Sequence, residues 1–226
     1  MQVAASPLVS CRGVTYMYSR GAAPAVVDVT MDVLRGDSIC LTGPSGSGKS
    51  TLLAILGGVV QPSEGSVRWW ATGERPSRDT ATDVHGCDAS WVMQTANLLP
   101  RAHALENAAL EAIIRGIPPS RALARSAAVL DELGLGAFYR TPARKLSGGQ
   151  AQRVAVARSI VASAPLILAD EPTGQLDSVS TARVVSALLA TVPAGATVVM
   201  ASHDPAVAER CSRVLTMVDG TIRDDR

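Results

Sequence analysis

Aromatic side chains and lysines are scarce in this 226-residue chain, and both shortages limit how it can be built. Phe, Trp and Tyr make up only 3% of the residues although 47% are hydrophobic, so Ala, Val, Leu and Ile must form the core. Lys49 and Lys145 are the only lysines among 21 basic residues, so chance poorly explains a lysine inside a glycine-rich loop. The length allows one large domain, or a core with an added lobe.

The chain also lacks an excess of charge of either sign. It has 21 basic and 20 acidic residues, and its formal net charge is +1. This balance provides no electrostatic surface for nucleic acid or for an acidic membrane, so we expect no nucleic acid partner. The cysteines form no CxxC pair and no metal-ligand spacing with histidine, which fits isolated thiols in a reducing compartment: Cys11, Cys40, Cys87 and Cys211.

No apolar run is both long enough and continuous enough to predict a membrane span. Residues 184–202 carry no charge over 19 positions, but Pro193 and Gly195 interrupt them. A helix end, a turn and a β-rich run describe this segment better than a transmembrane helix does. The amino-terminal residues lack the basic start and the apolar stretch of a secretory leader, so we expect no leader.

Short strand-like stretches separated by turns predict an antiparallel sheet near the start of the chain, and strands alternating with helices follow. The predicted strands are residues 8–18, 25–34, 38–42, 66–70, 165–169, 196–201, 214–218 and 221–223. Asp219 and Gly220, between the last two strands, are typical of a tight hairpin turn. Polar residues 71–90 show no periodicity and predict a loop.

Two regions have helical character. Residues 49–56 follow a glycine-rich loop and are closed by two further glycines. Residues 104–135 have a helical pattern, with Ser120 expected as an N-cap and Gly134 expected to end the helix.

Residues 43–50 read Gly-Pro-Ser-Gly-Ser-Gly-Lys-Ser and fit the GxxxxGK[ST] motif between an apolar strand and a helix. The glycines let backbone N–H groups surround phosphate oxygens, and the helix start adds partial positive charge. Lys49 is placed to reach the β- and γ-phosphates, and the Ser50 hydroxyl to bind Mg²⁺. This segment, called the phosphate loop below, predicts nucleotide binding, although guanylate kinase-like enzymes carry a similar loop.

Two adjacent acids end the strand predicted at residues 165–169. Asp170 is suited to hold Mg²⁺, directly or through water, and Glu171 to orient and polarise a water for in-line attack. His203 follows the next strand, where it either donates a hydrogen bond to charge on the γ-phosphate or is purely structural. Gln94 ends another apolar run and either contacts Mg²⁺ or the attacking water, or lies in an ordinary turn.

A second glycine-rich turn precedes a further helix. Residues 146–150 read Leu-Ser-Gly-Gly-Gln, and this signature segment repeats the physics of the phosphate loop, because small residues expose N–H groups at a helix start. The chain therefore has two anion sites but only one set of groups for Mg²⁺ and water. Two copies arranged head to tail would let each signature segment reach the γ-phosphate held by the other copy. The alternative is an ordinary helix cap with two glycines.

These motifs and their order resemble the nucleotide-binding subunit of an ABC transporter over nearly the whole chain. The order is the phosphate loop, a Q-loop at Gln94, the signature segment, Asp170 and Glu171, a D-loop at residues 174–177 and a switch histidine, His203. The resemblance implies an α/β fold, in which a P-loop NTPase (RecA-like) core carries an antiparallel β subdomain and an inserted α-helical subdomain. It implies a single ABC ATPase domain over residues 1–226, with the core in 1–94 and 155–226 and the helical subdomain with the signature motif in 95–154.

The resemblance also implies ATP and Mg²⁺ as ligands and gives roles to individual residues. It assigns catalysis to Glu171, His203 and Gln94, and Mg²⁺ binding to Ser50, Gln94 and Asp170. Tyr18 would stack on adenine, with Tyr16 as its rival because both face the same side of a strand. The implied ATP contacts are Tyr18, Gly43, Pro44, Ser45, Gly46, Ser47, Gly48, Lys49, Ser50, Thr51, Ser147, Gly148, Gly149, Gln150 and, across the dimer seam, Asp177.

Residues 169–177, Ala-Asp-Glu-Pro-Thr-Gly-Gln-Leu-Asp, resemble the ADEPTGNLD of the macrolide-efflux and lipoprotein-release group, with Gln175 in place of asparagine. The implied partners are a transmembrane permease subunit and a second copy of the chain, at the cytoplasmic face of a bacterial membrane. The implied function is ATP hydrolysis that drives export or mechanotransmission by the permease. Haem, a peptide or antibiotic, and a lipoprotein are alternative cargoes.

Two other functions stay open at this point. A soluble ABC ATPase acting on DNA or ribosomes usually has tandem cassettes or long coiled-coil insertions, and this chain has neither. A P-loop nucleotide kinase would not need the signature segment. One apolar group either receives a short helix of the permease or packs inside the helical subdomain: Leu98, Leu99, Pro100 and Ala104.

Overall fold

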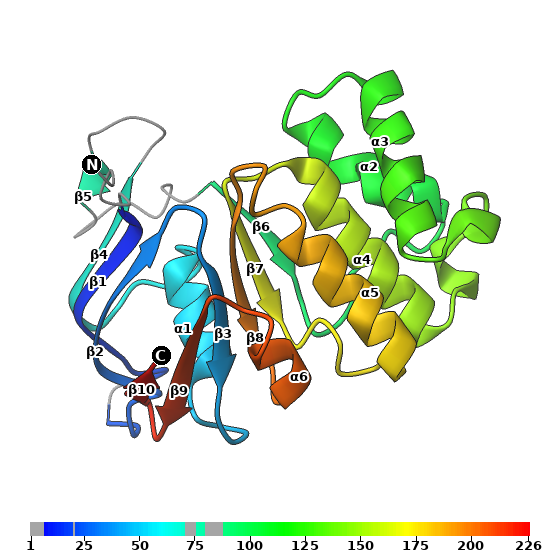
Figure 1. Ribbon diagram of the computed structural model, residues 1–226. Coiled ribbons are helices and arrows are strands. Elements are labelled where there is room, and N and C mark those ends of the chain that lie inside the picture. The colour runs from blue at the N-terminus through cyan, green and yellow to red at the C-terminus, as the bar shows by residue number, and fades with distance from the viewer. Residues whose placement is uncertain (1–6, 20, 71–75, 80–87) are drawn as a thin grey trace.

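The computed structural model describes residues 7–19, 21–70, 76–79 and 88–226. Within them, two β-sheets lie on either side of helix α1 (Lys49–Leu56), as Figure 1 shows. The first sheet is antiparallel and has the order β2 (Val26–Leu34), β1 (Pro7–Tyr16), β4 (Glu64–Trp70) and β5 (Pro76–Asp79). The second has the order β10 (Thr221–Asp225), β9 (Arg213–Val218), β3 (Ser38–Thr42), β8 (Thr197–Ala201), β7 (Leu166–Asp170) and β6 (Ala89–Val92).

Strands β9 to β6 of the second sheet are parallel, and their side chains alternate between two hydrophobic cores. Ile39 and Leu41 of β3 pack with α1 and the antiparallel sheet, whereas Cys40 between them packs on the opposite face. Helices α4 (Gly148–Ala162) and α5 (Ser178–Leu189) cover that face. This layering brings the carboxyl ends of the parallel strands to one edge, where the loops that follow them carry the candidate site.

Three helices pack together beside the parallel sheet: α2 (Ala104–Ile114), α3 (Pro119–Glu132) and α4. Small side chains let them approach closely, since Ala109, Ala112 and Ala122 form a buried cluster with Val161. The short 3-10 turns η1 (Gly136–Phe138) and η2 (Ala143–Lys145) lead into α4, and the short helix α6 (Pro205–Ala208) follows β8. The boundary predicted between residues 154 and 155 falls inside the continuous helix α4. The division into a nucleotide-binding core and a helical subdomain at these residues stays a prediction.

The helical character predicted for residues 104–135 is confirmed, but the expected start of the helix near Ser120 is shifted. Two helices occupy this stretch, and α2 ends before Arg115. Ser120 is not the N-cap, because α3 begins at Pro119 and Pro118 is the cap residue. The two prolines explain the break, since proline lacks a backbone donor and disfavours helical geometry in the residue before it, yet suits a first helical turn. Gly134 does lie in a left-handed turn just after α3, with φ of 71°.

The polar segment 71–90 is not a loop throughout. Strand β5 pairs with the edge of β4, and β6 begins at Ala89, inside the predicted loop. Pairing with a neighbouring strand orders these short segments, and such pairing leaves no periodic pattern in the sequence. Residues 71–75 and 80–87, with Cys87 among them, lie outside the described residues.

Several other predicted elements are confirmed. Strand β3 and helix α1 have the predicted bounds, and β9 and β10 flank the turn at Asp219 and Gly220, whose φ angles are 48° and 77°. The uncharged run 184–202 divides into the end of α5, a turn, β8 and Ser202. In the described part of the chain, no helix combines the length and the hydrophobicity needed to cross a bilayer.

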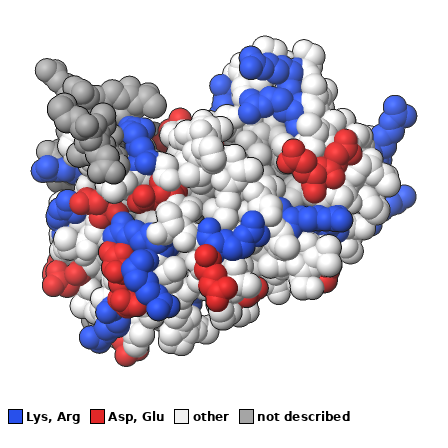
Figure 2. Space-filling model, in the orientation of Figure 1, with Lys and Arg blue, Asp and Glu red and all other residues white. Residues whose placement is uncertain are grey.

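Charged side chains of both signs are interspersed on the face shown in Figure 2. Two ion pairs join neighbouring strands: Arg12 of β1 with Asp32 of β2, and Arg213 of β9 with Asp225 of β10. Each pair links two neighbouring strands of one sheet. The mixture of signs on the surface fits the net charge of only +1.

Candidate functional site

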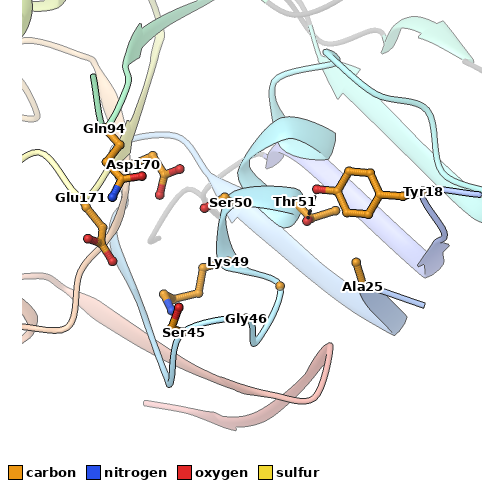
Figure 3. Close-up of a pocket in the computed structure, with 11 residues that line it drawn as sticks. Tyr18, Ala25, Ser45, Gly46, Lys49, Ser50, Thr51, Gln94, Asp170 and Glu171 are labelled. Carbon is orange, nitrogen blue, oxygen red and sulfur yellow. Dashed lines mark hydrogen bonds between the residues drawn. The ribbon is translucent and has the colours of Figure 1, made fainter. Parts of the chain in front are cut away.

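An open cavity of about 330 Å³ lies at the carboxyl edge of the parallel strands. Most of the predicted nucleotide and metal residues meet there although they come from distant parts of the chain, as Figure 3 shows. Polar side chains and backbone dominate its wall, which suits a charged ligand. The lining residues are Tyr18, Ala25, Ser45, Gly46, Gly48, Lys49, Ser50, Thr51, Gln94, Asp170 and Glu171.

The phosphate loop connects β3 to α1 and forms one wall of the cavity. Gly48 caps α1 in a left-handed conformation, with φ of 100°, and so turns the loop directly into the helix. Lys49 is only 7% exposed, and its Nζ donates to the carbonyl oxygens of Gly43 and Pro44 at 2.9 Å each. A buried ammonium needs such partners, and phosphate oxygens are stronger acceptors than carbonyl groups. Lys49 is therefore held where a phosphate group would reach it.

Three oxygen-bearing side chains meet on the side of the cavity near β7. Figure 3 shows Asp170 between the Gln94 amide and the Ser50 hydroxyl. A carboxylate, an amide oxygen and a hydroxyl are the hard ligands that Mg²⁺ prefers, and Mg²⁺ commonly keeps several waters beside a few protein ligands. The residues present therefore fit Mg²⁺ bound together with nucleotide phosphates.

Glu171 follows β7 in an unusual backbone conformation. Its φ is 47°, in the left-handed region that costs energy for a residue with a Cβ atom. Its N–H donates to the carbonyl of Ala201 at 3.0 Å, so the neighbouring strand β8 holds the bend. The carboxylate consequently turns into the cavity, with about 30% of the side chain exposed.

His203 follows β8 and stands at the rim of the site. Its Nδ1 lies 3.8 Å from Oε1 of Glu171, and 70% of its side chain is exposed. The preceding residue, Ser202, is buried, and its hydroxyl accepts the N–H of Asp204 at 3.1 Å. Asp204 in turn caps α6. This turn presents the imidazole to the open side of Glu171.

The structure separates the two tyrosines that compete for adenine stacking. Tyr18 lines the cavity and is 70% exposed, and its hydroxyl lies 2.8 Å from Oγ1 of Thr51. Tyr16 is half-buried against the first core, and its ring meets that of Tyr18 edge to face at 5.1 Å. Tyr16 thus supports the Tyr18 ring from behind, which favours Tyr18 as the stacking residue.

The signature segment lies outside this cavity. Ser147 caps α4, and a capping box joins it to Gln150: the Gln150 N–H donates to Oγ of Ser147, and the Ser147 N–H donates to Oε1 of Gln150. Ser147 is exposed at the surface. Of the predicted ATP contacts, the structure therefore brings the phosphate loop and Tyr18 together, but not Ser147, Gly148, Gly149 and Gln150.

The D-loop packs against the signature segment. A Cβ atom on Gly148 would lie 3.1 Å from Oε1 of Gln175, and one on Gly149 would lie 3.1 Å from Leu176. Asp177 caps α5 by accepting the N–H and the hydroxyl of Ser180, at 2.8 and 2.9 Å. The bonds from Ser180 lower the pKa of the Asp177 carboxyl, so this cap is charged.

Sequence reasoning missed the polar residues through which α4 holds the Q-loop. The Gln152 amide donates to the carbonyl of Met93 at 3.0 Å, and the Ser159 hydroxyl donates to that of Trp91 at 3.0 Å. Arg158 adds a bond to the carbonyl of Asn97 at 3.0 Å. Gln152 and Ser159 are two turns apart and buried on an otherwise apolar helix face, and that pattern is the signal that could have found them.

The apolar group expected near the Q-loop divides in two. Ala104 is fully buried and Leu98 is half-buried against the second core, so these two pack inside the protein. Leu99 is 51% exposed and Pro100 is exposed beside it. The surface available to a partner is therefore smaller than predicted.

The sequence and the fold match those of known proteins. Residues 26–174 match the family described as ABC transporter, and the chain belongs to that family. It is an ABC ATPase with a P-loop NTPase fold, an antiparallel sheet and added helices, as the resemblance implied. The family match favours this assignment over a nucleotide kinase.

Individual relatives with similar sequences are described as export proteins that join an ATP-binding part to a permease. The macrolide export ATP-binding/permease protein MacB 1/2 of Paracoccus denitrificans is 40% identical over 226 residues, covering 98% of this chain and 34% of that protein. The pyoverdine export ATP-binding/permease protein PvdT of Pseudomonas syringae pv. tomato is 36% identical, covering 97% and 34%. The chain thus spans about a third of the length of these relatives.

Solved structures give the same result for the fold. The ATP-binding cassette MJ0796, described as a dimeric post-hydrolysis state bound to ADP and Pi, superposes with a TM-score of 0.84 at 32% identity. The match covers 96% of this chain and 97% of that one.

Proposed function

We propose that two copies of this chain bind two MgATP molecules head to tail, and that closure and reopening of this dimer drive a transmembrane permease. The observation that carries the proposal is the position of the signature segment. Ser147 and its glycines lie outside the cavity that holds the phosphate loop, Asp170 and Glu171. A γ-phosphate in that cavity can be contacted by Ser147 only if a second molecule supplies it. MJ0796, a dimer by its description, supports this arrangement.

Each group in the cavity then has a defined task. Lys49 exchanges the carbonyl groups of Gly43 and Pro44 for the β- and γ-phosphates. Ser50, Asp170 and Gln94 hold Mg²⁺, which neutralises charge on the phosphates. Tyr18 stacks on the base.

Hydrolysis uses the groups after β7 and β8. Glu171 accepts a proton from the water that attacks the γ-phosphate in line, while His203 donates a hydrogen bond to the charge that develops there. The second copy contributes Ser147, the signature glycines and Asp177 at the seam. Loss of the γ-phosphate removes the group that both copies hold, so the dimer opens.

The membrane part of the proposal rests on the relatives. The MacB and PvdT proteins are described as ATP-binding/permease proteins for the export of macrolides and pyoverdine. We propose that this cassette likewise works on an export permease, at the cytoplasmic face of the membrane, with exposed Leu99 and Pro100 as part of the contact. A haem, peptide, antibiotic or lipoprotein cargo would be recognised by the permease rather than by this chain.

Replacement of Glu171 by Gln tests the dimer. Glu171→Gln keeps the size of the side chain but removes its basicity, so the hydrolysis rate should fall about 1,000-fold while ATP is still bound. Light scattering after size exclusion should then show an ATP-dependent dimer, in the presence of the permease if it is needed. Glu209→Gln, at an exposed position after α6, is the matched control and should hydrolyse ATP normally. An ATP-loaded Glu171→Gln variant that stays monomeric on its permease would overturn the head-to-tail arrangement.

A further inference from the structure

The tip of the carboxyl-terminal hairpin touches the phosphate loop. The Gly220 N–H donates to the carbonyl oxygen of Ser47 at 3.1 Å, and the carbonyl oxygen of Gly220 accepts the N–H of Val27 at 2.8 Å. Gly220 therefore joins the phosphate loop to the start of β2, although 173 residues separate it from Ser47 in the sequence.

Backbone packs directly on backbone at this junction. A Cβ atom on Gly43 would lie 2.1 Å from the carbonyl oxygen of Met217 in β9. A Cβ atom on Gly48 would lie 2.3 Å from the carbonyl oxygen of Ala25 and 3.3 Å from the methyl carbon of Met217. Side chains at the two loop glycines would force the hairpin and the residues before β2 away. The phosphate loop is thus enclosed on its outer side by two other segments.

The hydrogen bond from Gly220 orients one particular peptide group. The Ser47–Gly48 peptide is planar and trans, so its carbonyl and its N–H point in opposite directions. Because the carbonyl of Ser47 is held by the hairpin, the N–H of Gly48 faces away from the hairpin, and Gly48 lines the cavity on its other side. A preset N–H group binds an anion better than one that must first be ordered.

We propose that Gly220 is a positioning residue for the nucleotide: the hairpin tip at Asp219 and Gly220 holds the phosphate loop in the shape that receives phosphate. The inference rests on the proposed nucleotide site and adds a part of the chain that supplies none of the predicted contacts. The hairpin of β9 and β10 would then contribute to nucleotide affinity without contacting the nucleotide.

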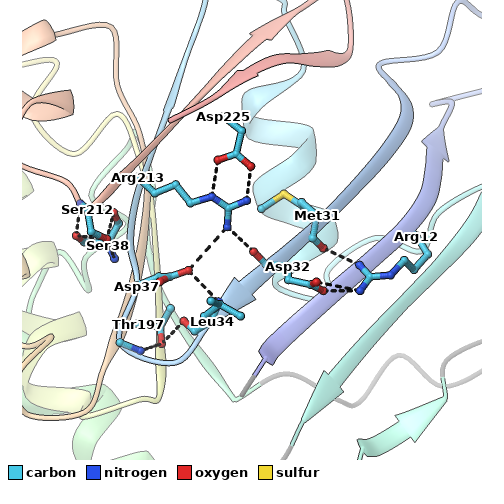
Figure 4. Close-up of polar contacts among 11 residues, drawn as sticks. Arg12, Met31, Asp32, Leu34, Asp37, Ser38, Thr197, Ser212, Arg213 and Asp225 are labelled. Carbon is cyan, nitrogen blue, oxygen red and sulfur yellow. Dashed lines mark hydrogen bonds and ion pairs between the residues drawn. The ribbon is translucent and has the colours of Figure 1, made fainter. Parts of the chain in front are cut away.

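The other end of the hairpin is firmly anchored, so the tip has a fixed support. Arg213 donates to both carboxylate oxygens of Asp225, from Nε at 2.6 Å and from Nη2 at 2.5 Å, and to the carbonyl of Asp32 at 2.6 Å, as Figure 4 shows. Asp37 lies 3.9 Å from the same guanidinium. Hydrogen bonds from Arg213 lower the pKa of Asp225, so the pair is charged at neutral pH. Arg213 consequently ties β9 and β10 to β2 and to the turn before β3.

Strand β9 connects the anchored end of the hairpin to the phosphate loop, because it pairs with β3, the strand that leads into that loop. It lies parallel to β3 in continuous register from Ile39 and Arg213 to Thr42 and Thr216. The hydroxyl groups of Thr42 and Thr216 are 3.2 Å apart, one residue before the phosphate loop begins. A change at Arg213 or Asp225 is therefore expected to reach the loop through a short, hydrogen-bonded strand.

The first test compares two glycines that both have positive φ. The angle is 77° at Gly220 and 88° at Gly116, which lies in the turn between α2 and α3. A Cβ atom on Gly220 would lie 3.1 Å from the carbonyl oxygen of Ala25, whereas no other atom lies within 4 Å of one on Gly116. Both alanine variants bear the strain of a left-handed residue. Only Gly220→Ala displaces the hairpin tip from the loop.

ADP binding to the purified chain with Mg²⁺, measured by calorimetry, is the readout, because it involves neither hydrolysis nor the dimer. We expect Gly220→Ala to bind ADP about tenfold more weakly, as one lost positioning bond implies, and Gly116→Ala to bind it as the wild type does. Thermal unfolding should show similar losses of stability in both. Unchanged ADP affinity in Gly220→Ala, or equal weakening in Gly116→Ala, would overturn the proposal.

A second measurement covers the case in which Gly220→Ala does not fold. Hydrogen exchange of the wild-type Gly220 amide should slow at least about tenfold when ADP is added, because the ordered loop holds its acceptor in place. The Gly195 amide, which donates to Val192 at 2.9 Å in a distant turn, is the control and should not respond. An unresponsive Gly220 amide would count against the hairpin's role, provided that ADP binds.

The anchor and the nucleotide site are tested separately. Asp225→Asn should weaken ADP binding about threefold, and Asp224→Asn, whose partner is Arg226, should not. Lys49→Ala should abolish binding. If the wild type itself bound no ADP, the nucleotide site would be wrong; if Lys49→Ala alone lost binding, only the positioning role of the hairpin would be wrong.

Discussion

Oε1 of Glu171 lies 3.8 Å from Nδ1 of His203, so the two groups proposed for hydrolysis face each other from the ends of neighbouring strands. The pairing of β7 with β8 creates this relationship, because Asp170 lies in register with Ala201. The N–H of Glu171 also bonds to the carbonyl of Ala201. A residue that follows β7 and one that follows β8 are thereby fixed on the same side of the cavity, although 32 positions separate them.

Replacing His203 by Ala should slow ATP hydrolysis about 100-fold, the usual loss when one donor to a developing negative charge is removed. ATP affinity should stay within about twofold of the wild type, since the imidazole stands at the rim and 70% of its side chain is exposed. Steady-state kinetics and equilibrium ATP binding separate the two effects. His103→Ala alters a half-exposed histidine at the N-cap of α2, and this variant should keep the wild-type hydrolysis rate. Equal losses in the two variants would contradict a catalytic role for His203.

Substitutions of Tyr18 should distinguish its ring from its hydroxyl. Tyr18→Ala removes the stacking surface and should raise KM for ATP about tenfold. Tyr18→Phe keeps the ring but loses the 2.8 Å contact with Thr51, so KM should change less than about threefold. Tyr16→Ala should mainly lower the melting temperature, because Tyr16 packs against the core. A larger rise of KM in Tyr16→Ala than in Tyr18→Ala would reverse the assignment of the adenine platform.

A negative charge introduced at position 147 should prevent formation of the ATP-bound dimer but leave helix α4 intact. Aspartate and asparagine both cap helices as well as serine does, so Ser147→Asp and Ser147→Asn should melt close to the wild type. Only Ser147→Asp brings a negative charge toward the γ-phosphate of the other copy, and its ATPase activity should fall at least about 100-fold below that of Ser147→Asn. ADP binding to the monomer should be normal in both. Equal activities would show that Ser147 does not meet a partner's nucleotide.

The described cysteines should differ strongly in reactivity. A hydrogen bond with Cys40 lowers the pKa of Cys211, the same contact and burial raise that of Cys40, and burial raises the pKa of Cys11 to about 12. The thiolate is the nucleophile, so iodoacetamide should modify Cys211 at a lower pH than an ordinary thiol, and Cys11 and Cys40 only after unfolding. Peptide mass mapping between pH 6 and 9 measures this, with Cys211→Ser as control. Early labelling of Cys11 would contradict its burial.

The structures of the local motifs in this chain could be predicted from the sequence because neighbouring residues determine their geometry. The glycines of the phosphate loop, the strand before it and the helix after it lie within 20 residues, and their bounds are confirmed. The turn at Asp219 and Gly220 is likewise a matter of two residues that accept positive φ. The proline pair at residues 118 and 119 was an available signal for the start of the second helix, which the sequence analysis placed slightly later, at Ser120.

What the sequence determined by itself, then, is the chemistry: a phosphate-binding turn, two acids at a strand end, and a second glycine turn with no metal groups beside it. Only the tertiary structure decided which residues meet. It set Tyr18 in the cavity and Tyr16 behind it, attached the Q-loop to Gln152, and placed Gly220 against Ser47. The contacts of Gln152 and Gly220 join segments that are far apart in the chain. They depend on strand order and on backbone packing, which a single sequence does not display as a local pattern.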